Sequence, residues 1–301
     1  MAIMWLWAAS ASVGFSQANV ESAALASLAR LDSGYAVLID ARGRFLCQQN
    51  LVRTDTVVAN FQGDTIELRW TGSDPISQLA LMETATPLQN AKPITLATSR
   101  SVKDQKVFAV IDSDLRPGQV VSADRMGIMK PSQRYLPLSE ILFESPSQKY
   151  GGSFVFTAEG KLFGVLSASL EPVAAEDQTF GPRGLTVSYS ISPDLLNRVV
   201  SGFRSESKLV KHPTVGLLFK DARAGGCEVV GFMAGSTAKQ AGIRVGDRVT
   251  RVGQARIRSS VDLAKALFQA PVGSLIELTL GSGDQARKIR VTVGATSSVI
   301  R

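Results

Sequence analysis

The sequence predicts a mainly β protein with two domains. Its 301 residues are about twice the length of a typical domain. Short runs of aliphatic, aromatic and β-branched residues, separated by turn residues, recur along residues 33–203 and are typical of a β-sandwich or a β-barrel. A polar stretch at 204–212, followed by Pro213, predicts a linker to a second domain at 213–301.

Composition and charge narrow the classes of partner. A hydrophobic share of 45% and a charged share of 20% are sufficient for a sizeable core. The net charge is +7, but the densest basic groups, Lys208–Lys211 and Arg287–Arg290, hold only two or three cations each. A nucleic-acid binder concentrates positive charge in one stripe or tail. We therefore predict no nucleic-acid partner, and a mildly basic surface that tolerates an anionic membrane or an acidic partner.

The two cysteines do not form a recognisable framework. Cys47 and Cys227 fall in different predicted domains, and the chain has no CxxC motif and no cluster with metal-ligand spacing. We expect both to be small buried hydrophobic residues and not a disulfide. No cofactor and no metal are predicted.

The amino-terminal segment, residues 1–32, allows two interpretations. Met1–Val20 is uncharged and strongly apolar at its start, as in an export signal, although the usual leading Lys or Arg is absent. Its apolar part is short for a membrane-spanning helix, which needs about 20 residues. An export signal or uncleaved anchor is one interpretation, and a buried or partner-contacting helix is the other. Residues 19–31 continue as a predicted helix with Leu25, Leu28 and Leu31 on one face.

Strands are predicted through residues 33–203 from alternating apolar runs that end at Gly, Asp or Asn turns. In chain order they are Tyr35–Ile39, Phe45–Cys47, Val57–Phe61, Thr65–Trp70, Val107–Ile111, Phe154–Phe156, Leu162–Ser167 and Thr186–Ser190.

Three phrases in this region carry a resemblance to a known family. They are GYAVLIDARGR at 34–44, GSDPISQLAL at 72–81 and GGSFVFTAEGKLFGV at 151–165, in that order. Together they resemble the trypsin-like domain of the HtrA-type serine proteases over roughly residues 33–200. The resemblance implies a trypsin-like double β-barrel whose catalytic triad lies at its three conserved motifs.

All three triad positions are changed in this chain. The resemblance aligns the family's histidine with Asn50, its aspartate with Gln78, and its serine nucleophile with Tyr150. Gln148 replaces the glycine whose amide helps to form the oxyanion hole. A serine hydroxyl is a poor nucleophile without a base, and losing either group costs about 10⁶ in turnover in a measured serine protease. We therefore expect no catalytic activity.

Three residues near the triad positions have side chains of the types that a serine–lysine dyad uses in place of the triad. Ser147 or Ser153 with Lys149 as base would form a serine–lysine dyad, but we interpret all three as surface loop residues. The single histidine, His212, lies beyond the predicted barrel and is interpreted as a linker residue. The three replaced triad residues are expected to converge and to form a neutral, hydrogen-bonded plug.

The second domain resembles a PDZ domain. Val215-Gly216-Leu217-Leu218 matches the apolar-Gly-apolar loop of that family, and Gly235–Ile243 followed by Val245–Val249 is its most diagnostic run. Further elements are predicted as a helix at Ser260–Phe268 and closing strands at Leu275–Leu280 and Ile289–Val293.

The resemblance implies that this domain captures a peptide. Backbone amides of Val215–Leu217 would hold a terminal carboxylate, and the peptide would add a strand beside Leu217–Phe219. We expect a partner with an apolar carboxy terminus; permanent occupation of the groove by the chain itself or by a fixed partner stays open. The predicted peptide-binding residues are Val215, Gly216, Leu217, Phe219, Leu263 and Leu267.

These expectations combine into a non-catalytic HtrA-like pseudoprotease that acts as a peptide-binding scaffold or adaptor. The predicted location is periplasmic or otherwise exported, with anchoring to a membrane by the first residues left open. Two alternatives remain: a fixed accessory subunit of a membrane-associated complex, and a divergent serine-type endopeptidase with a rearranged site. Assembly into a homo-oligomer is left open because related proteases often trimerise.

Overall fold

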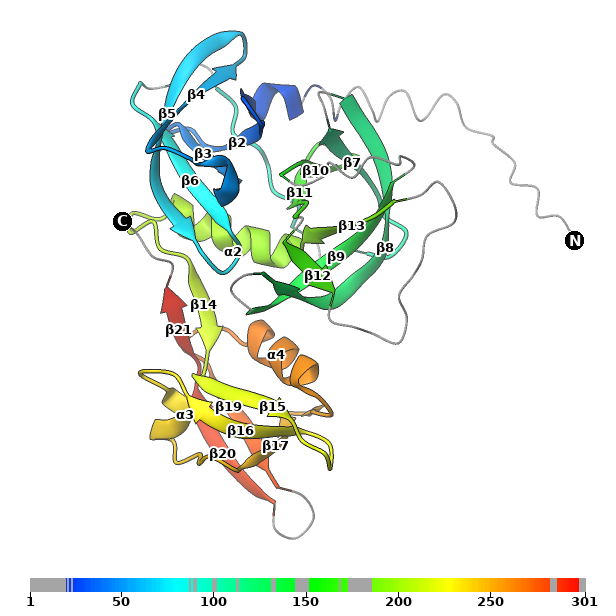
Figure 1. The fold of residues 1–301 in the computed structure, drawn as a ribbon, viewed down its shortest axis with the longest axis vertical. Helices are drawn as coiled ribbons and strands as arrows, with labels where there is room; N and C mark the ends of the chain where they lie inside the picture. The colour runs from blue at the N-terminus through cyan, green and yellow to red at the C-terminus, as the bar shows by residue number, and fades with distance from the viewer. Residues whose placement is uncertain are drawn as a thin grey trace, which may run out of the picture. The chain divides into compact units, whose positions relative to one another are not determined.

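The computed structural model describes residues 20, 22, 24–86, 88, 91–98, 102–111, 114–130, 134–143, 152–167, 169–172, 186–281 and 286–297. The chain divides into two compact units, one formed mainly by residues up to Lys208 and the other mainly by Leu209–Ser298. Strands dominate both units (Figure 1), so the mainly β prediction is confirmed.

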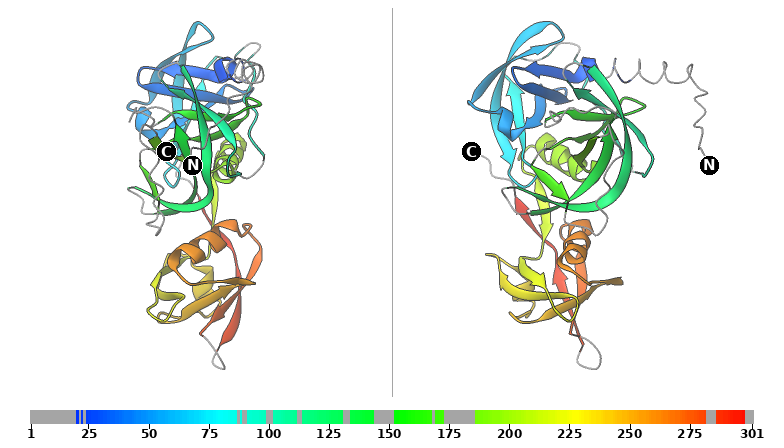
Figure 2. Two further views of the ribbon diagram at one scale, coloured as in Figure 1. Left: turned by 90° about the vertical axis from the view of Figure 1, so that its right-hand side faces the viewer. Right: turned by 45° about the vertical axis from the view of Figure 1, so that its right-hand side comes forward.

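The first sheet of the first unit closes into a six-stranded barrel in the order β1-β2-β3-β6-β5-β4. Figure 2 shows it, in blue to cyan, from two further directions. Its interior is apolar and includes Phe45 and Phe61, whose rings meet edge to face with centroids 5.3 Å apart. The strands are β1 (Leu28–Leu31), β2 (Gly34–Asp40), β3 (Arg44–Gln48), β4 (Thr56–Phe61), β5 (Asp64–Asp74) and β6 (Leu79–Thr84).

The barrel begins earlier than expected. The predicted helix over 19–31 is wrong at its end, because Leu28–Leu31 form β1, which pairs with β2 and with β4. Residues 24–27 are helical, as predicted. Leu28 and Leu31 are buried as the helix prediction required, but their segment closes the barrel between β2 and β4, where Ala29 and Arg30 have a cross-strand partner on each side. Leu25 is exposed instead of joining them.

The second sheet of the first unit also curls toward a barrel. Its strand order is β11-β10-β7-β8-β9-β13, and β12 pairs with β8. A bridge between Leu166, directly after β11, and Ser190 in β13 joins the two ends of this order. The strands are β7 (Lys106–Ile111), β8 (Asp114–Met129), β9 (Arg134–Phe143), β10 (Phe154–Thr157), β11 (Leu162–Val165), β12 (Leu170–Pro172) and β13 (Thr186–Ile191).

Helix α2 (Pro193–Arg204) packs on the first unit and is fixed at both ends. Ser192 caps its start by accepting a hydrogen bond from the amide of Leu195. At its end, the buried Arg44 guanidinium donates to the carbonyls of Phe203 and Arg204, 2.9 Å away in each case. A cation at this position also suits the negative end of the helix dipole. Because Arg44 belongs to β3, these bonds join α2 to the first barrel.

The second unit contains a five-strand order, β15-β16-β17-β19-β20, with β18 beside β17, and a separate pair, β14-β21. The predicted helix at 260–268 and both closing strands are present within two residues. The elements are β14 (Lys211–Thr214), β15 (Leu217–Asp221), β16 (Cys227–Phe232), α3 (Thr237–Gln240), β17 (Arg248–Val252), β18 (Ala255–Arg256), α4 (Ser260–Gln269), β19 (Leu275–Leu280), β20 (Arg287–Thr292) and β21 (Gly294–Ser297).

His212 is not a linker residue. It lies in β14, is 4% exposed, and is the cross-strand partner of Thr296 in β21. The segment between α2 and β14 is therefore 205–210, shorter than the linker predicted at 204–212. The polar composition suggested a longer linker because β14 itself begins with Lys211 and His212.

No helix among the residues that the structure describes is long and apolar enough to cross a bilayer. Residues 1–19, on which the signal or anchor prediction depends, lie outside the described part of the chain.

Candidate functional site

Two of the three positions that the family resemblance assigns to the triad lie on neighbouring segments of the first barrel. Asn50 is exposed and sits in a short 3₁₀ helix, Gln49–Leu51, that follows β3 directly. Gln78 ends the turn between β5 and β6. The amide of Gln49 donates to the carbonyl of Gln78 at 2.9 Å, which ties the two segments together. Tyr150, the third position, lies outside the described residues, as do Gln148, Ser147 and Lys149.

The side chain of Gln78 connects the two barrels. Its Nε2 donates to the carbonyl oxygen of Lys130 at the end of β8, 2.6 Å away. Its backbone has a φ of +57°, a left-handed conformation that costs a non-glycine residue about 1 to 3 kcal/mol. This bond joins the amide to a backbone carbonyl of the second barrel. The predicted plug also includes Tyr150, which lies outside the described residues, so it stays a prediction.

Gln48, which is not among the predicted site residues, also connects the two barrels through its side-chain amide. The residue ends β3, is 7% exposed, and donates from Nε2 to the carbonyl oxygen of Leu166 at 2.7 Å. The same carbonyl accepts from the amide of Gly152 at 3.0 Å. A polar residue ending the otherwise apolar run Phe45–Cys47 was the available signal, since buried polar groups require partners.

Gly152 is held close to this group. Its φ is +91°, and a Cβ built on it would lie 3.5 Å from Oε1 of Gln48. Ser153, the next residue, was interpreted as a surface loop residue, but it is 7% exposed and its carbonyl accepts from the amide of Leu166 at 2.9 Å. Ser153 is therefore buried because it leads directly into the core strand β10.

A buried carboxylate shapes the turn that carries Gln78. Asp74 is fully buried at the end of β5 and accepts hydrogen bonds from the hydroxyl of Ser77 at 2.6 Å and from its amide at 3.1 Å. Its negative charge also favours the charged form of Arg198 in α2, although burial lowers the pKa of that guanidinium overall. Asp74 therefore positions the turn between β5 and β6.

The chemistry of the described part of this site is that of neutral amides. The side chains of Gln48, Asn50 and Gln78 donate and accept hydrogen bonds but do not ionise near neutral pH. Burial raises the pKa of the Cys47 thiol in β3 to about 12, so this thiol is protonated at neutral pH. No group of His, Cys, Asp or Glu able to hold a metal occurs among the described residues.

Both cysteines are free and buried, as the sequence predicted. Burial also raises the pKa of Cys227 to about 12, and the charges of Asp221 and Asp262 add to the rise.

In the second unit, Gly216 occupies a position that only glycine fits. Its φ is +74°, and a Cβ there would lie 2.7 Å from both Cα and Cβ of Ser236. The loop is fixed to the following segment because the carbonyl of Val215 accepts from the amide of Ala238 and from the hydroxyl of Ser236. The loop that was predicted to hold a carboxylate is therefore fixed in one backbone conformation.

One amide of this loop already has a partner. The backbone N–H of Gly216 donates to the hydroxyl oxygen of Thr214 at 3.0 Å. A peptide carboxylate that uses all three amides of Val215–Leu217 must therefore displace the Thr214 hydroxyl from the central one.

Strand β15 offers a place for an added strand. It stands at one end of the five-strand order and pairs only with β16 among the described strands. Its end is tied to helix α4 because the carboxylate of Asp221 accepts a hydrogen bond from the amide of Ser260. An unpaired strand edge is the feature that peptide-binding domains use for β-strand addition.

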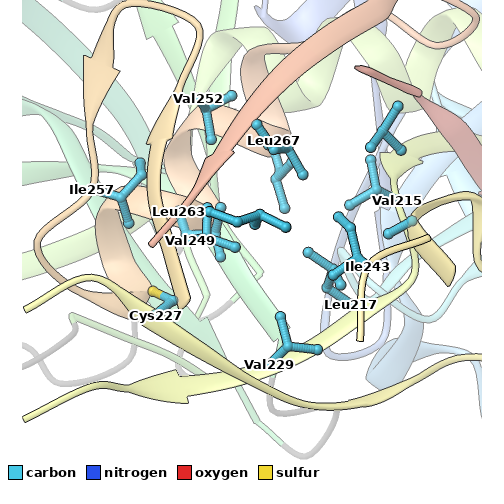
Figure 3. Close-up of a cluster of buried hydrophobic side chains, with 14 of the residues drawn as sticks. Val215, Leu217, Cys227, Val229, Ile243, Val249, Val252, Ile257, Leu263 and Leu267 are labelled. Carbon is cyan, nitrogen blue, oxygen red and sulfur yellow. The ribbon is translucent and has the colours of Figure 1, made fainter. Parts of the chain in front are cut away.

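The predicted pocket residues converge, but they are closed. Figure 3 shows Val215, Leu217, Leu263 and Leu267 within one cluster of buried side chains. Leu263 is fully buried, and Leu267 is 9% exposed. Phe219 packs against the same cluster from its margin. In this structure these residues belong to the apolar core of the second unit.

Comparison with known proteins agrees with this architecture. Residues 228–280 match the family of PDZ domains. The chain is 23% identical over 288 residues to Protease Do-like 1, chloroplastic, of Arabidopsis thaliana, and 24% identical over 265 residues to the periplasmic serine endoprotease DegP of Salmonella typhimurium. These matches cover 87% and 82% of this chain but only 63% and 54% of the relatives, so the chain spans less than two thirds of their length.

Solved structures show the same fold along nearly the whole chain. The HtrA-type protease AlgW with decapeptide aligns with a TM-score of 0.66 at 17% identity, covering 93% of this chain and 98% of that one. The serine endoprotease from Yersinia pestis aligns with a TM-score of 0.61 at 16% identity, with the same coverage. The predicted fold is therefore confirmed: the chain has the trypsin-like fold of the HtrA-type proteases followed by a PDZ domain.

Proposed function

We propose that this protein is a non-catalytic HtrA-like pseudoprotease that binds peptides or proteins through its PDZ domain. The observation that carries the proposal is the residue pair Asn50 and Gln78 at the positions that the family resemblance assigns to the catalytic base and its aspartate. An amide cannot accept the proton of a nucleophile at any useful pKa. Tyr150 stands at the position that the resemblance assigns to the serine nucleophile.

The contacts of the two glutamines support this proposal. In a serine protease the base must keep one ring nitrogen available to the nucleophile, and the carboxylate must bond to that base. Here the Gln78 side chain donates to the Lys130 carbonyl, and the neighbouring Gln48 donates to the Leu166 carbonyl. Both amides join the two barrels, which is a role in stability and not in proton transfer.

The binding function is supported by the second unit. The seated loop at Gly216 and the edge strand β15 are the two parts that carboxylate capture and strand addition require. Two of the similar solved structures are the HtrA-type protease AlgW with decapeptide and with tripeptide. By this likeness we propose a peptide as the partner, and the apolar side chains of the predicted pocket favour an apolar carboxy terminus.

We further propose that the protein is exported. The support is the likeness to the periplasmic DegP proteins of Salmonella typhimurium and Escherichia coli, together with the uncharged, apolar start of the sequence.

Two measurements on the full chain test the proposal. A fluorophosphonate probe should leave the protein unlabelled, and a casein digestion assay should show no turnover, with an active HtrA-type protease as the positive control. Stoichiometric labelling of any residue in 145–155 would identify a serine peptidase with a rearranged site instead.

The binding function is tested separately by peptide titration. Peptides with a free apolar carboxy terminus should bind weakly and reversibly, because a short peptide loses conformational freedom when it becomes a strand. If an amidated peptide binds as well as its free acid, carboxylate capture at Val215–Leu217 is wrong.

A further inference from the structure

The positive charge of this protein is concentrated in its second unit. Residues 209–298 contain 13 Lys and Arg and six Asp and Glu, whereas the rest of the chain contains 20 of each kind. The whole net charge of +7 therefore belongs to this unit. The cations are scattered along the sequence of this unit and form no single basic run.

Strand register gathers four of these cations on one face of the sheet. Arg256 in β18 is the cross-strand partner of Arg251 in β17, which lies opposite Thr279 in β19. Thr279 in turn lies opposite Lys288 in β20. Cross-strand partners project to the same face, and Arg290 follows Lys288 by two residues, so it shares that face. We name the exposed side chains of Arg251, Arg256, Lys288 and Arg290 the basic face.

The basic face retains most of its charge. Glu277, the cross-strand partner of Arg290, lies among these cations, and its carboxylate pairs with Lys288 at 2.8 Å. The hydrogen bond from Lys288, and the charges of Lys288 and Arg290, lower the pKa of Glu277. Arg251 and Arg256 stand directly opposite each other, an arrangement of like charges that destabilises a sheet. Folding alone does not favour this arrangement, which points to a binding role.

An exposed leucine borders these cations. Leu275 precedes Glu277 by two residues on β19, so its side chain projects to the basic face, and it is 61% exposed. Val272, in the loop before β19, is 43% exposed. The strand rise places Leu275 roughly 13 Å along β19 from Thr279. Cations and an exposed aliphatic side chain thus share one face of the sheet.

We propose that the basic face binds the surface of an anionic lipid bilayer. Its cations would contact lipid phosphates, and Leu275 would enter the boundary between headgroups and acyl chains. A bilayer uses both features, whereas single-stranded nucleic acid relies on aromatic rings for stacking, and none of the residues that define the basic face is aromatic. β20 and the peptide edge β15 are at opposite ends of the strand order, so this surface is distinct from the proposed peptide site.

Co-sedimentation of the full chain with vesicles tests the proposal. Vesicles would contain either phosphatidylcholine alone or an equal mixture with phosphatidylglycerol. We expect binding to the anionic vesicles that weakens as salt is raised. Each cation near an anionic surface contributes roughly fivefold in affinity, so Arg251→Gln, Arg256→Gln and Arg290→Gln together should lower affinity about a hundredfold.

A matched control removes the same charge from the other unit. Arg53→Gln, Lys103→Gln and Lys106→Gln replace three exposed cations of the first unit and should leave vesicle affinity within about threefold. All variants keep the same amino-terminal residues, so a difference between the two triple variants cannot arise there. Leu275→Ser should lower affinity about tenfold without changing the salt dependence.

Three results would overturn the proposal. The first is equal binding to both kinds of vesicle, and the second is equal loss of binding in the two triple variants. The third combines two observations. Leu275→Ser binds anionic vesicles with unchanged affinity, and the unaltered protein binds a labelled 20-nucleotide DNA tightly and in a salt-sensitive manner that the basic-face triple variant loses. That combination would assign the face to nucleic acid.

Discussion

Replacing Gln48 with glutamate should destabilise the first unit in a manner that depends on pH. The amide of Gln48 is 7% exposed and its Nε2 lies 2.7 Å from the carbonyl oxygen of Leu166. A carboxylate there would place an acceptor against an acceptor, with almost no access to water. The protein can avoid this only by holding the new side chain protonated, which raises its pKa in the folded state.

The magnitude follows from that rise in pKa. Fully buried carboxyl groups shift by up to about 3 to 5 pKa units, and one unit corresponds to about 1.36 kcal/mol. A rise of about 3 units therefore removes about 4 kcal/mol from the free energy of unfolding at pH 7. The unfolded chain ionises near pH 4.3, so the loss is absent below that pH. It grows as the pH rises toward the folded-state pKa and is constant above it.

Urea unfolding at pH 4 and pH 7, followed by tryptophan fluorescence, measures this loss. All three tryptophans, Trp5, Trp7 and Trp70, precede the second unit, so the signal reports the first. Gln48→Met is the control, because it keeps the shape and removes only the hydrogen bond, at a cost of about 1 kcal/mol at both pH values. If the glutamate and methionine variants are equally stable at pH 7, Gln48 is not a buried donor and its connection between the barrels is wrong.

Two further predictions concern the second unit and the thiols. Gly216→Ala forces a Cβ against Ser236 at a φ of +74° and should lower peptide affinity, measured by calorimetry, at least tenfold. Thr214→Val frees the Gly216 amide and should raise peptide affinity a few-fold. The opposite order of affinities would refute the assignment of this loop to carboxylate binding. Burial raises the pKa of Cys47 and of Cys227 to about 12, so at pH 8 each thiol should be ionised in about one molecule in ten thousand. Iodoacetamide should therefore alkylate the folded protein slowly, and rapid alkylation would contradict the burial of the two thiols.

The sequence predicted strands best where apolar residues alternate and turns contain Gly or Asp. The hairpin between β4 and β5 is an example, because Gln62 and Gly63 both have positive φ, as a two-residue hairpin turn requires. The longest strand, β8, was missed because it contains Pro117 and Gly118, residues that argue against a strand. Pro117 is tolerated opposite Phe108 within the pairing of β7 and β8.

Helix α2 was missed although its signals were present. Ser192 at the cap, Pro193 at the first position and Asp194 in the first turn are a typical helix start. They follow β13 directly, and the resemblance to a β-rich domain favoured strands over a helix in this region.

The candidate sites could be predicted only as far as local motifs reach. Asn50 and Gln78 were placed because each lies next to a recognisable phrase, and their segments do adjoin through the Gln49 amide. The bond from Gln48 to Leu166 joins residues 118 positions apart, and the bond from Gln78 to Lys130 joins residues 52 apart. No local pattern reports such contacts. The basic face was hidden for the same reason, since its members become neighbours only through strand register.

Under the proposed function, the glutamine contacts also explain how a protease fold would persist without catalysis. An active site must keep polar groups poised and partly unsatisfied, a condition that lowers stability. Once Asn50 and Gln78 occupy those positions, the constraint is removed and nearby amides become available for contacts between the barrels. An amide bonded to a backbone carbonyl contributes about 1 kcal/mol, so the bonds of the buried Gln48 and the half-buried Gln78 are together comparable to the left-handed strain at Gln78. Under the proposed function, the region of the former catalytic centre thus holds the two barrels together, and the PDZ domain binds the ligand.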